Sequence, residues 1–247
     1  MSDSKIAERD TTELIPSPLD PALTEDQALA LLKHADLHAE VIEQLAKNKT
    51  ALKSRKVKVA LAGHPNTPRH VSVPLARQFY TFDLMKLALS PSVPADVKVA
   101  VENVLISHLK EVTMGERLTL ARRASGRVAA ALHDLESAGI KIVEPLARSM
   151  RLLQTALDNA RLTEALLINS VLRPRATAAL VQAVAQHAKW SRRKEIRAAL
   201  LRTEHLSLAR ALEFSREIPA DLLEEIIANS RLPSKIKDQL LRQSRTC

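Results

Sequence analysis

Cysteine, glycine and aromatic residues are scarce in this 247-residue chain. Its one cysteine, Cys247, is the last residue. A single cysteine excludes an intramolecular disulfide, a cysteine-held zinc site and a protein-held iron–sulfur cluster, and it fits a reducing cytoplasm. Only four glycines are present, so we expect no glycine-rich loop that binds phosphate. Aromatic residues make up 2% of the chain, which argues against affinity gained by stacking on nucleic-acid bases.

Long apolar runs are also missing. No run approaches the roughly 20 residues that a membrane-spanning helix needs. The first residues, MSDSKIAERDTTELIPSPLDP, are polar and acidic, whereas a signal peptide is basic and then apolar. We therefore expect a soluble protein of the cytoplasm.

The residues that dominate instead are Ala, Leu, Arg, Glu and Lys, which lose little on entering a helix. With 46% hydrophobic residues and a net charge of +9, the composition predicts an all-α protein with a substantial core. The charge is uneven along the chain. Residues 1–50 carry 5 basic and 10 acidic groups, residues 51–100 carry 8 and 2, and residues 151–200 carry 9 and 3. An acidic head therefore precedes two basic zones.

A recurring pattern divides the chain into short segments. In HPNTPRHV, at residues 64–71, Pro68 is followed three residues later by the apolar Val71. Ser and Thr cap helix starts, and Pro is tolerated in the first turn, so such a residue indicates where a helix begins. A capping box at Thr24 and further starts near Asp36 and Thr50 extend the pattern toward the N-terminus. Further instances begin at Thr81, Pro94, Ser125, Gly139, Ser149, Thr163, Thr177, Ser191, His205, Pro219 and Pro233, the last six at a constant spacing of fourteen.

Fourteen residues hold one helix of about ten residues and a tight turn. A single helix of this length cannot bury enough apolar surface to be stable, so consecutive helices must pack antiparallel and stack on their neighbours. We predict an α-solenoid of about sixteen short antiparallel helices in 28-residue helix-pair repeats. Residues 1–22 are predicted to be a disordered acidic tail, residues 23–243 a single solenoid domain and residues 244–247 a flexible C-terminus. The irregular stretch 95–124 is predicted to hold one longer helix.

These segments resemble known helical repeats. HPNTPRHV is similar to the turn of bacterial leucine-rich-repeat-variant repeats, and the segments NARLTEALL (159–167) and NSRLPSKIK (229–237) show the same sequence pattern. ADVKVAVENVL (95–105) and KEIRAALLR (194–202) are similar to HEAT-like helices. The resemblance covers residues 24–243 and implies a bacterial repeat protein. The cysteine-held clusters that accompany some such repeats are not implied here, because the ligands are absent.

Residues that would carry chemistry form no convincing group. His34 and His38 are four apart, with Asp36 and Glu40 nearby, but a helix start at Asp36 would separate them, so we favour a solvated surface over a metal site. The sequence contains no HExxH, GxSxG, GxGxxG or Walker motif. We therefore predict no catalytic residues, no cofactor and no metal. A hydrolase- or glycosylase-like enzyme whose site gathers distant residues stays open as a third alternative.

Basic side chains are the more informative feature. In KWSRRKEIR, Lys189, Arg193 and Arg197 are spaced to share one helical face, while Trp190 is predicted to pack in the core. Arg161, Arg175 and Lys189 recur at the same spacing of fourteen; Arg161 and Lys189 are expected on one rim of the stack, and Arg175 with Arg231 on the other. The predicted partner-binding residues are Lys53, Arg55, Lys56, Lys58, Arg161, Arg175, Lys189, Arg192, Arg193, Lys194 and Arg197.

The leading hypothesis is a non-catalytic scaffold whose curved face binds a protein with an acidic surface, steered by these cations. The alternative is a nucleic-acid-binding solenoid that contacts the phosphate backbone without reading bases. A solvated basic surface that only keeps the protein soluble is the simplest interpretation of the same residues.

Overall fold

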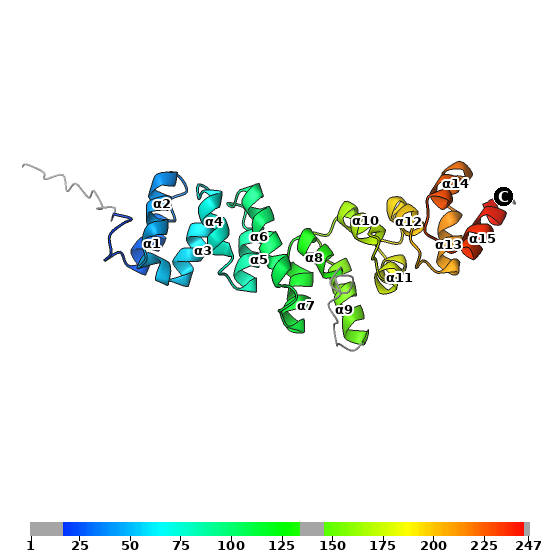
Figure 1. Ribbon diagram of the computed structural model, residues 1–247, viewed down its shortest axis with the longest axis horizontal. Helices are drawn as coiled ribbons and strands as arrows, with labels where there is room; N and C mark the ends of the chain where they lie inside the picture. The colour runs from blue at the N-terminus through cyan, green and yellow to red at the C-terminus, as the bar shows by residue number, and fades with distance from the viewer. Residues whose placement is uncertain (1–16, 134–145, 245–247) are drawn as a thin grey trace, which may run out of the picture. The chain divides into compact units, whose positions relative to one another are not determined.

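A computed structural model describes residues 17–133 and 146–244 of the chain (Figure 1). Within these ranges every regular element is helical and no strand occurs. The all-α prediction is confirmed. The helices are α1 (Glu25–Leu31), α2 (Ala39–Lys47), the 3-10 helix η1 (Ala51–Lys53), α3 (Arg55–Gly63), α4 (Arg69–Ala76), α5 (Thr81–Leu89), α6 (Ala95–His108), α7 (Met114–Arg123), α8 (Gly126–His133), α9 (Leu146–Leu157), α10 (Glu164–Leu172), α11 (Ala178–Gln186), α12 (Lys194–Leu200), α13 (Leu208–Ser215), α14 (Ala220–Ala228) and α15 (Ser234–Ser244).

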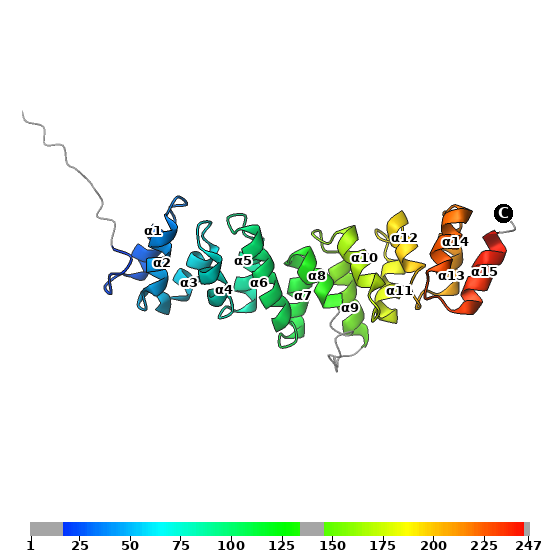
Figure 2. The same ribbon diagram turned by 45° about the horizontal axis from the view of Figure 1, so that its top comes forward.

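The helices form two compact units. The first contains residues up to Phe79 together with Ser90–Lys98, and the second contains Tyr80–Leu89 and the chain from Val99 onward. In the first unit α3 packs on α1, η1 and α4 (Figure 2). Ile42, Leu45, Val57 and Leu61 are among its fully buried side chains. This unit holds the earlier of the two basic zones.

In the second unit, many helices pack on the helix two places further along the chain. α8 packs on α10, α10 on α12, α9 on α11, and α13 on α15. A continuous core follows these contacts and includes Leu157, Leu167, Trp190, Ile196 and Phe214. A short helix such as α10 thus finds on two neighbours, α8 and α12, the apolar contacts that it cannot supply alone.

Four turns share one arrangement of hydrogen bonds, and HPNTP is among them. In each turn, the Oδ1 of an Asn or the Nδ1 of a His accepts a hydrogen bond from the backbone N–H two residues later. The pairs are Asn48 with Thr50 (3.0 Å), His64 with Asn66 (3.2 Å), Asn159 with Arg161 (2.8 Å) and His187 with Lys189 (3.2 Å). The other side-chain nitrogen, Nδ2 of Asn or Nε2 of His, binds a group 28 to 38 residues earlier. Asn48 binds the carbonyls of Pro18 and Asp20, His64 that of His34, Asn159 those of Ala121 and Ala124, and His187 the carboxylate of Asp158. These side chains therefore close their own turn and bind an earlier one, where helix ends leave carbonyls unpaired.

The recurring pattern located most helix starts correctly. Thr24, Thr163 and Thr177 are N-caps whose hydroxyls accept a backbone N–H, and Thr24 forms the predicted capping box. Pro68 and Pro219 are also N-caps. Helices α5, α6, α8 and α15 begin at or directly after Thr81, Pro94, Ser125 and Pro233. The predicted longer helix is α6, with 14 residues.

Other predicted starts differ from the observed ones. Ser149 lies inside α9, where it is buried. The N-caps of α2, α12 and α13 are His38, Arg193 and Ser207, each two residues after the position that the pattern marks and so within the two residues allowed for a predicted start. Thr50 precedes only the short η1, and Ser54 caps α3. In the α12 turn the extra residues bring Trp190 into the core before the helix begins. The start predicted at Gly139 lies outside the described residues.

The same unequal spacing of helices occurs twice in the chain. α1 to α6 begin at residues 25, 39, 55, 69, 81 and 95, and α10 to α15 begin at 164, 178, 194, 208, 220 and 234. Each start in the second set equals its counterpart in the first set plus a constant offset, so both sets advance by the same unequal steps. The steps are longest between α2 and α3 and between α11 and α12, and shortest between α4 and α5 and between α13 and α14. The predicted constant step therefore does not hold. We call residues 24–104 the first block and residues 163–243 the second block, and residues at the same place in the two blocks are equivalent.

Burial follows the same correspondence. Ala51 and Trp190 are equivalent and buried, as are Val57 and Ile196, Leu61 and Leu200, and Leu75 and Phe214. Few equivalent positions carry the same residue: the matches are Thr24, Glu25, Ala39, Ala46, Ala60, Leu61, Arg77, Leu84, Pro94 and Lys98. The two blocks thus share the positions of their helix starts and many of their buried positions, while most side chains differ.

The chain ends contain parts of two predicted flexible segments. Residues 17–22 form turns whose carbonyls at Pro18 and Asp20 accept hydrogen bonds from Asn48, so this part of the predicted tail is attached to the first unit. Residues 1–16 lie outside the described residues, as do 245–247 at the other end. In the part of the chain that is described, no helix combines the length and apolar character needed to cross a membrane.

Candidate functional site

The earlier basic cluster, residues 53–58, surrounds the start of α3. The Ser54 hydroxyl caps this helix by accepting the Val57 N–H at 3.4 Å. Arg55 and Lys56 then fall in the first turn, where no acidic residue is present. Positive charge is unfavourable at a helix N-terminus, so the helix dipole disfavours both cations at these positions. Lys53, Arg55 and Lys56 are exposed.

Two contacts partly offset this unfavourable placement. The Lys56 ammonium lies 3.0 Å from the Glu25 carboxylate, and Lys58 donates to the Gln78 side chain at 3.1 Å. The hydrogen bond from Lys56 lowers the pKa of the Glu25 carboxyl, with help from Ser54, and the same contact raises the pKa of Lys56. Both partners are exposed, so the pair contributes little to stability. No side-chain hydrogen bond or ion pair joins Lys53 to the described residues.

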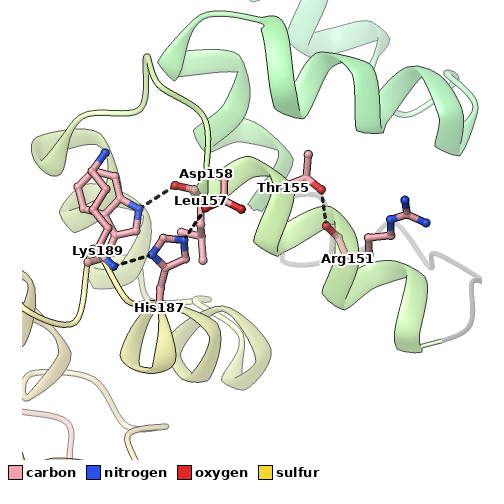
Figure 3. Close-up of polar contacts among 7 residues, drawn as sticks. Arg151, Thr155, Leu157, Asp158, His187 and Lys189 are labelled. Atoms are coloured by element: carbon pink, nitrogen blue, oxygen red, sulfur yellow. Dashed lines mark hydrogen bonds and ion pairs between the residues drawn. The ribbon is translucent and has the colours of Figure 1, made fainter.

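The later basic cluster begins in the turn between α11 and α12. His187 lies between Lys189 and Asp158 (Figure 3): its Nδ1 accepts the Lys189 N–H, and its Nε2 is 3.1 Å from the Asp158 carboxylate. The Trp190 indole N–H donates to the Leu157 carbonyl at 2.8 Å, and the side chain is 2% exposed. The prediction that Trp190 packs in the core is confirmed. Lys189 covers its ring, with the ammonium 4.0 Å from the centroid.

Arg197 is held by the protein itself. Its Nε donates to the Ser191 carbonyl at 2.6 Å, its guanidinium pairs with Glu217, and the group lies 5.4 Å from the centre of the Phe214 ring. Only 12% of its side chain is exposed. The structure therefore uses Arg197 to join α12 to the turn after α13.

Three other cations of this cluster point into solvent. Arg192, Arg193 and Lys194 are exposed, and no side-chain hydrogen bond or ion pair joins them to any described residue. The expected single helical face from Lys189 to Arg197 is wrong, because α12 begins only at Lys194 and the earlier residues form a turn. The exposed set is contiguous in sequence rather than spaced along a helix.

Turn-to-turn hydrogen bonds show where the remaining predicted residues lie. Arg161 donates to the Arg123 carbonyl at 3.3 Å, and Arg231 donates to the Leu172 carbonyl at 2.9 Å. The turn with Lys189 is bonded to the turn with Arg161, and the turn with Arg231 to the turn with Arg175. This pairing follows the alternation that the sequence predicted. Arg161, Arg175 and Arg231 are all exposed, and the side chains of Arg161 and Arg231 also bind backbone carbonyls of an earlier turn.

His34 and His38 are not part of a metal-binding group. His34 follows α1, and its carbonyl accepts a hydrogen bond from His64, while His38 is the N-cap of α2. Across the residues that the structure describes, no three His, Cys, Asp or Glu side chains are placed to hold a metal ion.

Sequence reasoning missed two features. The Asn and His residues that close the turns were not identified, although each stands at or just after a helix end and precedes a polar or basic residue by two places. A groove of about 290 Å³ between α2 and α4 was also missed. Its signal was Pro74, a proline inside a predicted helix.

Comparison of the chain with protein-family models, with curated proteins and with solved structures found no match in any of the three.

Proposed function

We propose that the chain is a non-catalytic protein-binding scaffold of the α-solenoid class, whose exposed cations select a partner with an acidic surface. One observation carries the proposal. Of the five cations in the later basic cluster, Lys189 and Arg197 lie over aromatic rings, and Arg197 is only 12% exposed. Arg192, Arg193 and Lys194 are consecutive in sequence, are exposed, and have no side-chain hydrogen bond or ion pair with a described residue. A contiguous set of exposed like charges steers an oppositely charged partner and sets the orientation in which it binds.

A solenoid is supported by the packing of helices on the helix two places along the chain in the second unit. A protein partner is favoured over nucleic acid by the acidic residues among the cations. Glu195 follows Lys194 directly and is exposed, and Glu217 and Glu213 are paired nearby. The buried Trp190 offers no surface on which bases could stack.

The test is a charge reversal with a matched control. The variant Arg192→Glu, Arg193→Glu, Lys194→Glu removes the exposed cations. The control Lys86→Glu, Lys110→Glu, Arg122→Glu makes the same change in net charge at exposed positions elsewhere. Both should keep the helicity and melting temperature of the wild type, because exposed charges contribute at most about 1 kcal/mol each.

Each protein is then used to capture partners from a cell lysate, with and without nuclease, at low and moderate salt. We expect a protein that survives nuclease, is lost with the variant and is retained with the control. The surface would be assigned to nucleic acid instead if nuclease abolishes the capture and if the log of the binding affinity falls with the log of the salt concentration. The expected slope is about 0.9 per phosphate contact. Equal capture by variant and control would show that these cations only solubilise the protein.

A further inference from the structure

The groove between α2 and α4 belongs entirely to the first unit. Its floor is apolar, from Ala46, Val71, Pro74 and Leu75, and its rim is polar, from Glu43, Lys47 and His70. At about 290 Å³ it lies below the usual range of small-molecule sites, about 300 to 1,000 Å³. Its size therefore suits one or two side chains of a larger partner.

Pro74 gives the groove a feature that a regular helix lacks. It lies inside α4, and because proline has no N–H it cannot donate to the carbonyl of His70, four residues earlier. Both residues line the groove. The groove thus combines an apolar floor with the His70 carbonyl, which lacks the hydrogen bond that residue 74 would donate in a regular helix. Proline inside a helix is also costly, and departures from local rules of this kind concentrate at functional positions.

The charges of the rim differ in availability. The Glu43 carboxylate is 3.3 Å from the His70 imidazole, so an intramolecular partner faces it. Lys47 is exposed, and its side chain has no hydrogen bond or ion pair with a described residue. The rim therefore offers one available positive charge, in a chain with a net charge of +9. An acidic ligand complements it.

The second block shows that the fold does not require this groove. At the positions equivalent to Val71 and Pro74 it has Arg210 and Glu213, which form an ion pair at 2.6 Å. The Arg210 guanidinium lies 6.0 Å from the centre of Phe214, the equivalent of Leu75, so a charged pair covers this surface. The equivalent of Lys47 is Gln186. The apolar floor, the proline and the free cation occur together in the first block alone.

We propose that this groove binds an acidic peptide segment of the partner protein: an aliphatic side chain on the floor, a carboxylate beside Lys47 and a peptide N–H at the His70 carbonyl. The inference rests on the proposed scaffold function and names a second contact point for the partner. Glu43 and Lys47 at separate positions on the rim give the bound segment a direction.

The test uses defined peptides and the whole 247-residue chain labelled with nitrogen-15. The probe is acetyl-EDLDE-amide; one control peptide replaces its leucine with serine, and a second replaces every acidic residue with lysine. We expect saturable shifts of backbone amides in α2 and α4 at about millimolar peptide, as befits one small contact. The serine peptide should bind at least fivefold more weakly, and the lysine peptide should not shift these amides.

Three variants test the separate contacts. Val71→Arg with Pro74→Glu installs the side-chain pair of the second block and should abolish binding while the circular dichroism spectrum stays unchanged. Lys47→Glu should weaken the acidic peptide about tenfold, as expected for about 1.4 kcal/mol. Pro74→Ala supplies the missing N–H, so it should raise the melting temperature and weaken binding severalfold.

Several results would overturn the proposal. Shifts confined to residues 189–197, or equal binding of the leucine and serine peptides, would show attraction by charge without use of the groove. Sedimentation that reveals a dimer, dissociated by Val71→Arg with Pro74→Glu, would make a second copy of the chain the occupant. If that double variant fails to fold, Lys47→Glu and the peptide controls still decide. Loss of peptide binding with intact nuclease-resistant capture would remove the groove and leave the scaffold function standing.

Discussion

The first and second blocks use equivalent cations differently. Lys58 and Arg197 occupy equivalent positions at the starts of α3 and α12, and each reaches a side chain in the turn after the next helix, Gln78 or Glu217. Lys58 makes this single hydrogen bond, whereas Arg197 also binds the Ser191 carbonyl and lies against Phe214. The equivalent of Phe214 is Leu75, and that of Trp190 is Ala51. In the second block Arg197 lies against an aromatic ring and is 12% exposed; in the first block, where Leu75 and Ala51 stand in place of the rings, Lys58 has one hydrogen bond to a side chain.

The largest expected effect comes from removing the aromatic difference. Trp190→Ala gives the second block the residue found at Ala51, but the surrounding core has formed around an indole that is 2% exposed. We expect a loss of about 3 to 5 kcal/mol in the free energy of unfolding, measured by urea denaturation. Trp190→Phe, which keeps a ring and loses the bond to Leu157, should cost markedly less. A loss below about 1 kcal/mol for the alanine variant would contradict a structural role for the indole.

The next effect compares the two equivalent cations directly. Arg197→Ala removes a side chain that is 12% exposed and has three partners, and should cost about 2 kcal/mol. Lys58→Ala should cost less than about 1 kcal/mol, because its one contact is at the surface. Urea denaturation of both variants measures the difference. Equal losses would mean that the aromatic residues of the second block do not decide the role of the cation.

A smaller effect tests whether the turns are interchangeable. Asn48 and His187 are equivalent and make matching hydrogen bonds. Asn48→Ala leaves two backbone N–H groups and two carbonyls without their partner and should cost about 1 to 3 kcal/mol. The exchanges Asn48→His and His187→Asn should each cost less than the alanine change. Thermal melting of these variants provides the comparison, and an exchange as damaging as alanine would disprove the equivalence.

The smallest effect concerns charges that differ between the blocks. Glu25 and Lys56 form an ion pair in the first block, while their equivalents are Glu164 and Glu195. Because Lys56 lowers the pKa of Glu25, the stability from this carboxylate is present above its unfolded pKa and is lost as pH falls through the folded one. Lys56→Glu should lower the melting temperature slightly at neutral pH and low salt. The difference from wild type should shrink in acid and in high salt, and a difference independent of both would contradict the electrostatic cause.

Local chemistry made the helices predictable. Thr163 and Thr177 act as caps through their own hydroxyls, and Pro68 and Pro219 through their own backbone preference, so each is visible in the sequence. The caps of α12 and α13 lie two residues after Ser191 and His205. In the turn before α12, the Trp190 indole binds Leu157 at the distant end of α9, a contact that no local pattern reports. The six-helix correspondence was hidden because the two blocks share helix starts and buried positions but few side chains.

The candidate site was harder to predict for the same reason. Charge identified the cations at 53–58 and 189–197, but only three-dimensional contacts separate Arg192, which is exposed, from Arg197, which is engaged. The groove depends on how Ala46 and Val71 come together from two helices, and no local pattern reports that distance.

The hydrogen bonds from each turn to an earlier one also bear on how the chain folds. Most of them join residues about 30 positions apart, so each requires closure of a short loop, whose entropic cost grows only slowly with length. Contacts of such limited range favour rapid folding, and a nucleus can begin at any neighbouring set of helices and grow outward. Helices with more packed neighbours open less readily. Amide hydrogen exchange should therefore be slower in α10, which packs on both α8 and α12, than in α14, whose main neighbour is α15.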